Sequence, residues 1–182
     1  HAAGVRTYLT VNTIIYNSEI DEMHRLLHAV KDAGVSAIIA SDMAVINYAR
    51  QIGVEVHIST QCNVSNTEAV RYYAQFADVI VTARELPLQQ VAEIVNYIKE
   101  NDIRGPRGEL VRIELFCHGA LCMSVSGKCY LSLDNYNYSA NRGACLQLCR
   151  RGYIVKDKES DLELEIDNEY IMSPKDLCTI GF

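Results

Sequence analysis

The first two-thirds of the chain alternates short apolar runs with longer segments whose apolar residues recur at helical spacing. The apolar runs have the β-branched and aromatic content of buried strands and occupy residues 8–15, 36–42, 54–60, 78–85 and 111–117. The segments with helical spacing occupy residues 20–33, 43–53, 67–77 and 87–100. Strands that are apolar along their whole length and are separated by helices predict a parallel sheet covered by helices.

Two architectures share this pattern: an open doubly wound sheet and a (β/α) TIM-like barrel. No GxGxxG motif follows any of the strands, which counts against a dinucleotide-binding fold. Five strands are too few to close an eight-stranded barrel, so a barrel here would be partial, with its N-terminal strands missing from the chain. We therefore predict an α/β chain with a barrel portion over residues 1–118, followed over residues 119–182 by a cysteine-rich segment and a small β appendage.

The last part of the chain has a different pattern. Residues 161–167 alternate acidic and apolar side chains, which predicts a strand with one solvated face. The flanking residues 153–157 and 170–173 would complete the β appendage. Residues 173–178 predict an N-capped turn, with Ser173 as the cap and Pro174 at the first helical position.

Polar side chains follow each predicted strand of the barrel portion, and in parallel α/β folds the carboxyl ends of the strands form the site. Some of these residues are expected only to cap the helix that follows, namely Ser41, Asp42 and Asn66. The catalytic candidates among the strand-end residues are Gln61, Arg84, Glu114 and His118.

The net charge of −6 argues against binding of nucleic acid through the whole surface, but it leaves room for a local basic patch. The cations that could form such a patch are Lys128, Arg142, Arg150 and Arg151. No run is long enough to cross a bilayer, and no signal peptide is recognised, so we predict a cytoplasmic protein without a membrane partner.

Seven cysteines in a chain of this size, without a secretory signal, point to metal binding or catalysis more than to disulfides. Five of them fall within residues 114–151, a stretch that we expect to be loop backbone folded around a metal rather than helix or strand. Zinc sites commonly use close cysteine pairs, and here only Cys145 and Cys149 are close, so the wide spacing favours an iron–sulfur cluster over zinc. Reduced structural thiols are the alternative, and Cys62 and Cys117 are expected to be ordinary buried residues.

Several motifs in this stretch occur together in one known family. They are Glu114, His118–Cys122, Ser126–Cys129, Leu131–Ser132 and Asn141–Arg150, with residues 57–66 and 83–86 upstream and 173–178 downstream. With these motifs the chain resembles the collagenase-like peptidase family, which also includes prephenate-dependent tRNA and ribosomal RNA hydroxylation proteins and ubiquinone-hydroxylation partners. Lys128 departs from the family pattern, in which arginine is usual.

The resemblance implies a barrel-like catalytic domain that lacks its first strands here, because residues 8–12 resemble the third strand of the family. It also implies a four-iron, four-sulfur cluster. The ligands implied by the resemblance are Cys122, Cys129, Cys145 and Cys178, with Cys149 competing for the fourth position.

Three functions remain open from the sequence. The first is an enzyme or subunit that hydroxylates tRNA or ribosomal RNA, with the four cations contacting phosphates unless they are simply a solvated surface. The second is a collagenase-like peptidase, which needs a Cys–His pair or a hydrolytic metal; His118 is close to Cys117 and Cys122 in sequence, and no HExxH motif occurs. The third is a non-catalytic partner that binds the cluster for structure or assembly.

Overall fold

The computed structural model describes residues 4–125, 128–160, 162–166 and 176–178. The chain divides into two compact units, His1–Leu115 and Phe116–Phe182. The boundary drawn from the sequence, after residue 118, falls inside a strand that begins at His118.

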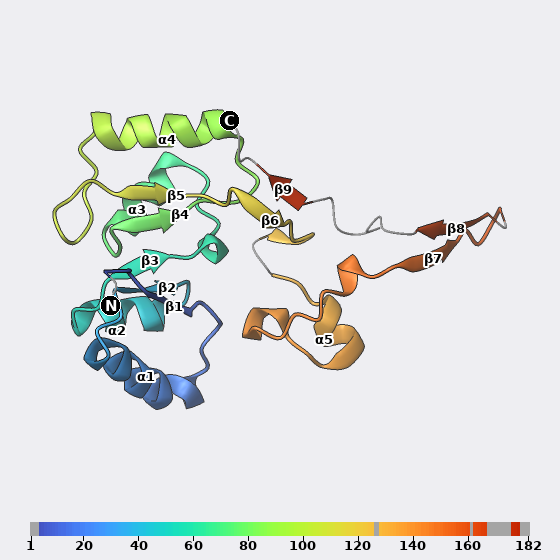
Figure 1. Cartoon of the computed structure of the whole chain (residues 1–182), viewed down its shortest axis with the longest axis horizontal. Helices are drawn as coiled ribbons and strands as arrows, with labels where there is room; N and C mark the ends of the chain where they lie inside the picture. Colours follow the sequence, from blue (N-terminus) through green and yellow to red (C-terminus); the bar gives the residue numbers. More distant parts are fainter. Residues whose placement is uncertain (1–3, 126–127, 161, 167–175, 179–182) are drawn as a thin grey trace. The chain divides into compact units, whose positions relative to one another are not determined.

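Unit 1 contains a five-stranded parallel sheet in which each strand pairs with the one before it in the chain, in the order β1-β2-β3-β4-β5 (Figure 1). The strands are β1 Tyr8–Val11, β2 Ala37–Ala40, β3 Val56–Ile58, β4 Val79–Val81 and β5 Arg112–Glu114. All five predicted strands are present, each shorter than the apolar run that predicted it, and the parallel sheet is confirmed.

Four helices connect these strands. They are α1 Ile20–Asp32, α2 Met43–Gln51, α3 Thr67–Ala74 and α4 Leu88–Glu100. The side chains of Asp42 and Asn66 accept hydrogen bonds from backbone N–H groups in the first turns of α2 and α3, so both caps predicted from the sequence are confirmed. Gly34 and Gly53 follow α1 and α2 with φ values of 66° and 78°, which end these helices at little steric cost.

All four helices share one hydrophobic core with a single face of the sheet. That face contributes Val11, Ile38, Ala40, Ile58 and Ile80, and the helices contribute Leu27, Ile46, Val70 and Ile94 among others. A doubly wound sheet would need helices against both faces. The strand order is sequential, all four helices contact the same face, and β1 and β5 are the two edges of the sheet; the (β/α) barrel stays a prediction from the sequence.

The opposite face of the sheet carries polar residues. In the strand register His57 lies between Ile39 and Val79, and Val79 pairs with Arg112, so these side chains share a face that does not belong to the common core. We call this the polar face and define it by Tyr8, Glu55, His57, Arg112 and Glu114.

Unit 2 is built from short elements. Strand β6 (His118–Ala120) pairs antiparallel with β9 (Asp176–Cys178), and β7 (Tyr153–Lys156) pairs antiparallel with β8 (Glu163–Ile166). Helix α5 spans Leu131–Tyr136. The β7–β8 hairpin confirms the predicted β appendage within the described residues, whereas residues 170–173 lie outside them.

Two expectations for unit 2 were wrong. Residues 114–151 are not loop throughout, because they contain β6 and α5. Residues 176–178 form a strand rather than a turn, because this segment pairs with β6. Strand β6 is remote in sequence, so a local sequence pattern could not predict this pairing. Ser173 and Pro174, the predicted cap and first helical residue, lie outside the described residues.

Candidate functional site

The carboxyl ends of the first three strands hold a small polar cluster. The hydroxyl of Ser41 lies 2.9 Å from the carbonyl oxygen of Asn12 and 3.0 Å from Oε1 of Gln61. Ser41 was expected to cap α2, and this was wrong, because Asp42 already occupies the cap position. Gln61 is thus held in place by Ser41. Arg84 is half-buried in the loop after β4.

Cys62 extends this cluster. Its side chain is half-buried, packs against the core and lies 3.7 Å from the carbonyl oxygen of Ser41. Burial, followed by the charge and hydrogen bond of Cys62, raises the pKa of Tyr73 to about 12, so this phenol stays protonated. The packing of Cys62 agrees with a structural role. Cys117, which was also expected to be buried, is exposed instead.

Glu55 organises the polar face at the amino end of β3. Its carboxylate is 8% exposed and accepts hydrogen bonds from Arg6 at 3.2 Å, from Arg112 at 3.5 Å and from Arg107. Burial raises the pKa of Glu55, but the hydrogen bond to His57 and the charges of Arg107 and Arg6 outweigh it and lower the pKa below the ordinary value. Glu55 is therefore ionised at neutral pH and joins three arginines from separate segments of unit 1.

His57 is the second buried member of this network. It is 3% exposed, and its Nε2 lies 3.2 Å from Oε1 of Glu55. Burial lowers the pKa of His57, and the carboxylates of Glu55 and Glu114 only partly oppose this effect. The imidazole is therefore neutral at pH 7, with its proton on Nε2, because the carboxylate of Glu55 can only accept.

The sequence analysis missed Glu55 and His57. A sequence pattern that could have identified them was present, because the run from Val54 to Ile58 alternates apolar and ionisable residues. This period of two places both ionisable side chains on one face of the strand. The apolar content of the run concealed this alternation. Glu114, a catalytic candidate from the sequence, lies on the same face, with its side chain 52% exposed.

The neutral state of His57 predicts acid sensitivity of the fold. Because its folded pKa is lowered, the unfolded chain binds more protons, so this contribution is present above the unfolded pKa near 6.5 and is lost as pH falls below it. We expect the free energy of unfolding, measured in urea from about pH 7.5 to about pH 5, to decline less in His57→Gln than in the parent protein. Equal declines in the two proteins would contradict this assignment.

A cavity of about 340 Å³ opens at the amino end of the same sheet. Its walls include Glu55, Asp78 and Arg107, but none of the four catalytic candidates. Asp78 accepts a hydrogen bond from the backbone N–H of Arg107, and Glu55 is engaged with the arginines. The acidic groups of this cavity thus maintain the fold, and we do not place the chemistry there.

In unit 2, three cysteines share one local geometry. The sulfur atoms of Cys122, Cys129 and Cys145 each lie 3.4 Å from the backbone nitrogen two residues further on. Backbone N–H groups directed at cysteine sulfur also occur around cysteine-bound metal clusters, where they hydrogen-bond to the ligating sulfurs. Donor type and local backbone therefore fit a soft metal or an iron–sulfur cluster at these three positions.

Helix α5 connects two of these cysteines. It begins at Leu131, whose backbone N–H points at the sulfur of Cys129. The buried hydroxyl of Ser132 accepts a hydrogen bond from the backbone of Leu146, the residue after Cys145. The Leu131–Ser132 motif thus holds both cysteine loops against α5.

Cys149 lies near the same three thiols. Burial raises the pKa of the Cys149 thiol, and the negative charges of Cys122, Cys145 and Cys129 raise it further. Among the described residues, however, no group of three or more His, Cys, Asp or Glu side chains is arranged to hold a metal ion. The other three thiols are close enough to Cys149 to influence its charge, but the described side chains do not form a ligand set in this structure.

Cys178, the other candidate for the fourth position, lies on β9. It is exposed, and its direct partner across the strand pair is His118. Side chains directly opposite each other on antiparallel strands have Cβ atoms about 5 Å apart, so the register brings a thiol and an imidazole next to each other. The sequence placed His118 near Cys117 and Cys122, whereas the fold pairs it with Cys178.

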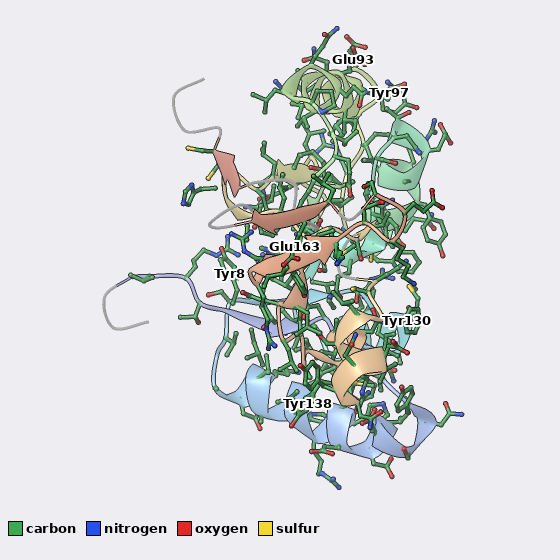
Figure 2. All side chains as sticks on the ribbon, turned by 90° about the vertical axis from the view of Figure 1, so that its right-hand side faces the viewer. Tyr8, Glu93, Tyr97, Tyr130, Tyr138 and Glu163 are labelled. Carbon is green, nitrogen blue, oxygen red and sulfur yellow. The ribbon has the colours of Figure 1, made fainter. Side chains whose placement is uncertain are left out.

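The basic residues of unit 2 occur together with exposed tyrosines. Residues 116–153 contain four cations and one carboxylate, a net charge of +3 in a chain whose total is −6. Tyr130, Tyr136 and Tyr138 are 70%, 51% and 52% exposed. Figure 2 labels Tyr130 and Tyr138 at the two ends of α5, and the guanidinium of Arg151 lies 5.7 Å from the centre of the Tyr136 ring.

Comparison with known proteins identifies the family. The model of peptidase family U32 matches residues 1–182. The chain belongs to peptidase family U32. This U32 chain is 63% identical over 179 residues to a protein named collagenase from Porphyromonas gingivalis, covering 98% of the chain and 43% of that relative. No solved structure matches it.

Other relatives of the U32 chain carry different names. It is 35% identical over 160 residues to the 23S rRNA 5-hydroxycytidine C2501 synthase of Escherichia coli, covering 87% of the chain and 23% of that relative. It is 34% identical over 184 residues to the tRNA hydroxylation protein P1 of Bacillus subtilis, covering 97% of the chain and 41% of that relative. The chain thus spans less than half the length of each of these curated relatives. Within its described residues, no helix is long and apolar enough to cross a membrane.

Proposed function

We propose that this protein is an enzyme, or the subunit of one, that hydroxylates a pyrimidine of tRNA or ribosomal RNA, using an iron–sulfur cluster bound by unit 2. The observation that carries the proposal is the repeated N–H···S geometry at Cys122, Cys129 and Cys145. Thiolates are the form of cysteine that binds metals, and hydrogen bonds to the sulfur atoms help to set the reduction potential of cysteine-bound clusters. The coupling of Cys149 to these three thiols supports Cys149 as the fourth ligand, with Cys178 as its competitor.

A bound cluster would supply one-electron transfer. The protein's own residues would then orient the cluster and attract the substrate. The three backbone N–H groups stabilise negative charge on sulfur, which bears on the reduction potential. Lys128, Arg142, Arg150 and Arg151 provide the local positive charge that a polyanion requires in an otherwise acidic chain.

RNA is supported as the substrate by two independent features. Relatives named for RNA hydroxylation align over 87% and 97% of the chain. The +3 segment also carries exposed tyrosines, and aromatic faces next to cations are the usual platform for unpaired bases. The test is mass spectrometry of tRNA and ribosomal RNA nucleosides from cells that lack the full-length protein. Loss of a nucleoside carrying one additional oxygen, restored by the gene but not by its Cys129→Ala form, is the expected result. An unchanged set of nucleosides would contradict the proposal, and a cluster without any hydroxylation defect would favour the non-catalytic partner.

The tyrosines lead to a separate prediction. We expect Tyr130→Ala to weaken binding of a single-stranded RNA oligonucleotide by about 1–3 kcal/mol, because one stacked base is lost, and Tyr130→Phe to bind nearly as the parent does. Fluorescence anisotropy of the full-length protein with labelled RNA measures both. Tyr72→Ala, at a tyrosine of unit 1 that is 52% exposed, is the control. Binding of heparin, a polyanion without bases, should be unchanged in Tyr130→Ala, and a parallel loss would indicate disturbed folding instead of lost stacking.

A peptidase is the second candidate. Two relatives named collagenase are 63% and 53% identical to the chain, and His118 is the cross-strand partner of Cys178. A thiol beside an imidazole is the minimum arrangement for a cysteine nucleophile. Hydrolysis of gelatin by metal-free protein, abolished in both Cys178→Ala and His118→Ala, would establish this reading in place of RNA hydroxylation.

A further inference from the structure

The polar face contains a buried nitrogen whose hydrogen bond is missing. Nδ1 of His57 is buried and has no hydrogen-bond partner. Oε2 of Glu114 lies 4.0 Å from it, which is too long for a direct hydrogen bond. Buried polar groups without a partner cost free energy and are rare, so this atom calls for a functional explanation.

The surroundings of His57 show what is missing. The groups facing the imidazole are the carboxylate of Glu55 on its own strand, the ring of Tyr8 from β1 at 5.0 Å, and Arg112 and Glu114 from β5. The neighbours in register on β2 and β4 are Ile39 and Val79, which carry no charge. With the proton on Nε2, Nδ1 presents a lone pair toward a carboxylate, so two acceptors face each other. A proton shared between Nδ1 and the carboxylate of Glu114 would satisfy both acceptors.

Accessibility differs between the two acceptors. Glu114 ends β5, and its side chain is 52% exposed, whereas the side chain of His57 is 4% exposed. A ligand can therefore reach the carboxylate but not the imidazole. Because Glu114 also lies at the carboxyl end of its strand, it is placed where parallel α/β folds bind their substrates.

We propose that Glu114, supported by His57, accepts a proton from an N–H or O–H group of the substrate at the polar face of unit 1. The carboxylate of Glu114 takes the proton as the X–H bond breaks, and the electron pair stays on X. The proton then passes to Nδ1 of His57, which becomes an imidazolium, and Glu114 returns to the carboxylate. No electron is exchanged, so the step needs no oxidant. Glu114 touches the substrate and is the catalytic residue, and His57 is a positioning residue.

Glu55 makes the second transfer possible. It stays bound to Nε2–H when Nδ1 gains a proton, so the imidazolium has a carboxylate on each side. Arg6, Arg107 and Arg112 keep Glu55 ionised throughout, which prevents the proton from being lost to it. This arrangement gives the three arginines around one carboxylate a role in the chemistry in addition to their role in stability.

The substrate group follows if the RNA function proposed above is correct. The N–H donors of a pyrimidine base are N3–H in uridine and the N4 amino group in cytidine. Either could donate to Glu114, and removing a proton from the base would increase its electron density before oxidation. This assignment rests on the proposed function, whereas the pair formed by His57 and Glu114 does not.

The pair is tested without RNA and without an activity assay. In full-length protein labelled with ¹⁵N and ¹³C histidine, NMR titration follows the His57 ring, which is assigned by its absence in His57→Gln. We expect Glu114→Gln to lower the pKa of His57 by roughly half a unit to one unit, because a negative neighbour about 4 Å away is removed. Glu109→Gln, which neutralises an exposed carboxylate in the loop before β5, is the matched control and should leave the pKa unchanged.

Two outcomes would contradict the proposed interaction of His57 with Glu114. One is that His57 does not titrate between about pH 5 and pH 9, and the other is that its pKa is the same in the parent protein and in both glutamate variants. Neither outcome would contradict the proposed RNA hydroxylation, because that function is tested separately by mass spectrometry of the RNA nucleosides. The substrate assignment has its own readout, in which uridine should shift the His57 signals and 3-methyluridine, which lacks N3–H, should not. Equal responses, or none, would overturn the pyrimidine assignment.

Discussion

Full-length protein carrying Cys129→Ala is expected to lose its iron. Purified without oxygen, the parent protein should contain about four irons and four sulfides per chain, with the broad visible absorption of an iron–sulfur cluster. Cys129 belongs to the three thiols that share the N–H···S geometry, and it lies two residues before the start of α5. Its removal would therefore take away both a proposed ligand and the sulfur acceptor at the start of that helix.

Controls separate metal loss from unfolding. Cys62→Ser changes a cysteine of unit 1 that packs against the core and should retain the full iron content. Because Ser132 still accepts its hydrogen bond from the backbone of Leu146, the secondary structure of Cys129→Ala should be largely preserved. Iron unchanged in Cys129→Ala, or zinc in place of iron in the parent, would contradict the cluster.

The fourth ligand is decided by one pair of variants. Cys149→Ser is expected to lose iron, because Cys149 is charge-coupled to the other three thiols, and Cys178→Ser is expected to retain it. Iron content and the electron paramagnetic resonance spectrum of the reduced protein measure both. The opposite result would assign the fourth position to Cys178, as the family resemblance implies, and would remove Cys178 from any role as a nucleophile.

Glu55→Gln is expected to destabilise unit 1 by about 2–4 kcal/mol, the second large effect. The carboxylate is buried, and its charge is matched by three arginines and by a hydrogen bond from His57. Glutamine keeps the volume but removes the charge, so the arginines lose their common partner and the amide can satisfy only part of the network. Urea unfolding of the full-length protein, followed by circular dichroism, measures the difference.

The matched control is an ion pair at the surface. Asp102 and Arg104 contact each other at 2.8 Å, but their side chains are 66% and 51% exposed. Asp102→Asn should leave stability unchanged within error, because water replaces the lost partner and because asparagine tolerates the positive φ of 48° at this position. Equal losses in Glu55→Gln and Asp102→Asn would show that burial does not govern the strength of these pairs.

The fold of unit 1 could be predicted because its pattern is local. The period of the apolar residues predicts each strand and helix. The helix caps at Asp42 and Asn66 could be recognised directly from residue type and position in the sequence. The choice between a doubly wound sheet and a barrel could not be made, because both have the same order of elements. The packing of all four helices against one face of the sheet is likewise a tertiary feature that the local pattern does not reveal.

The candidate sites were predicted only in part. Cys122, Cys129 and Cys145 stood out by residue type and motif, but the N–H···S geometry depends on backbone angles that sequence spacing does not reveal. The pairing of His118 with Cys178 joins two segments far apart in the chain and has no local signal. His57 was hidden because one ionisable residue in a short apolar strand changes the pattern little.

The sequential order of the sheet bears on how the protein forms during synthesis. Because every strand of unit 1 pairs with the strand before it, each new β/α segment can add to structure that is already present as the chain leaves the ribosome. Strand β6 differs, since its partner β9 begins at Asp176, more than fifty residues later. The β6–β9 pair can therefore form only after translation has passed β9, so the cysteine segment between the two strands is synthesised before the ends of that segment are joined.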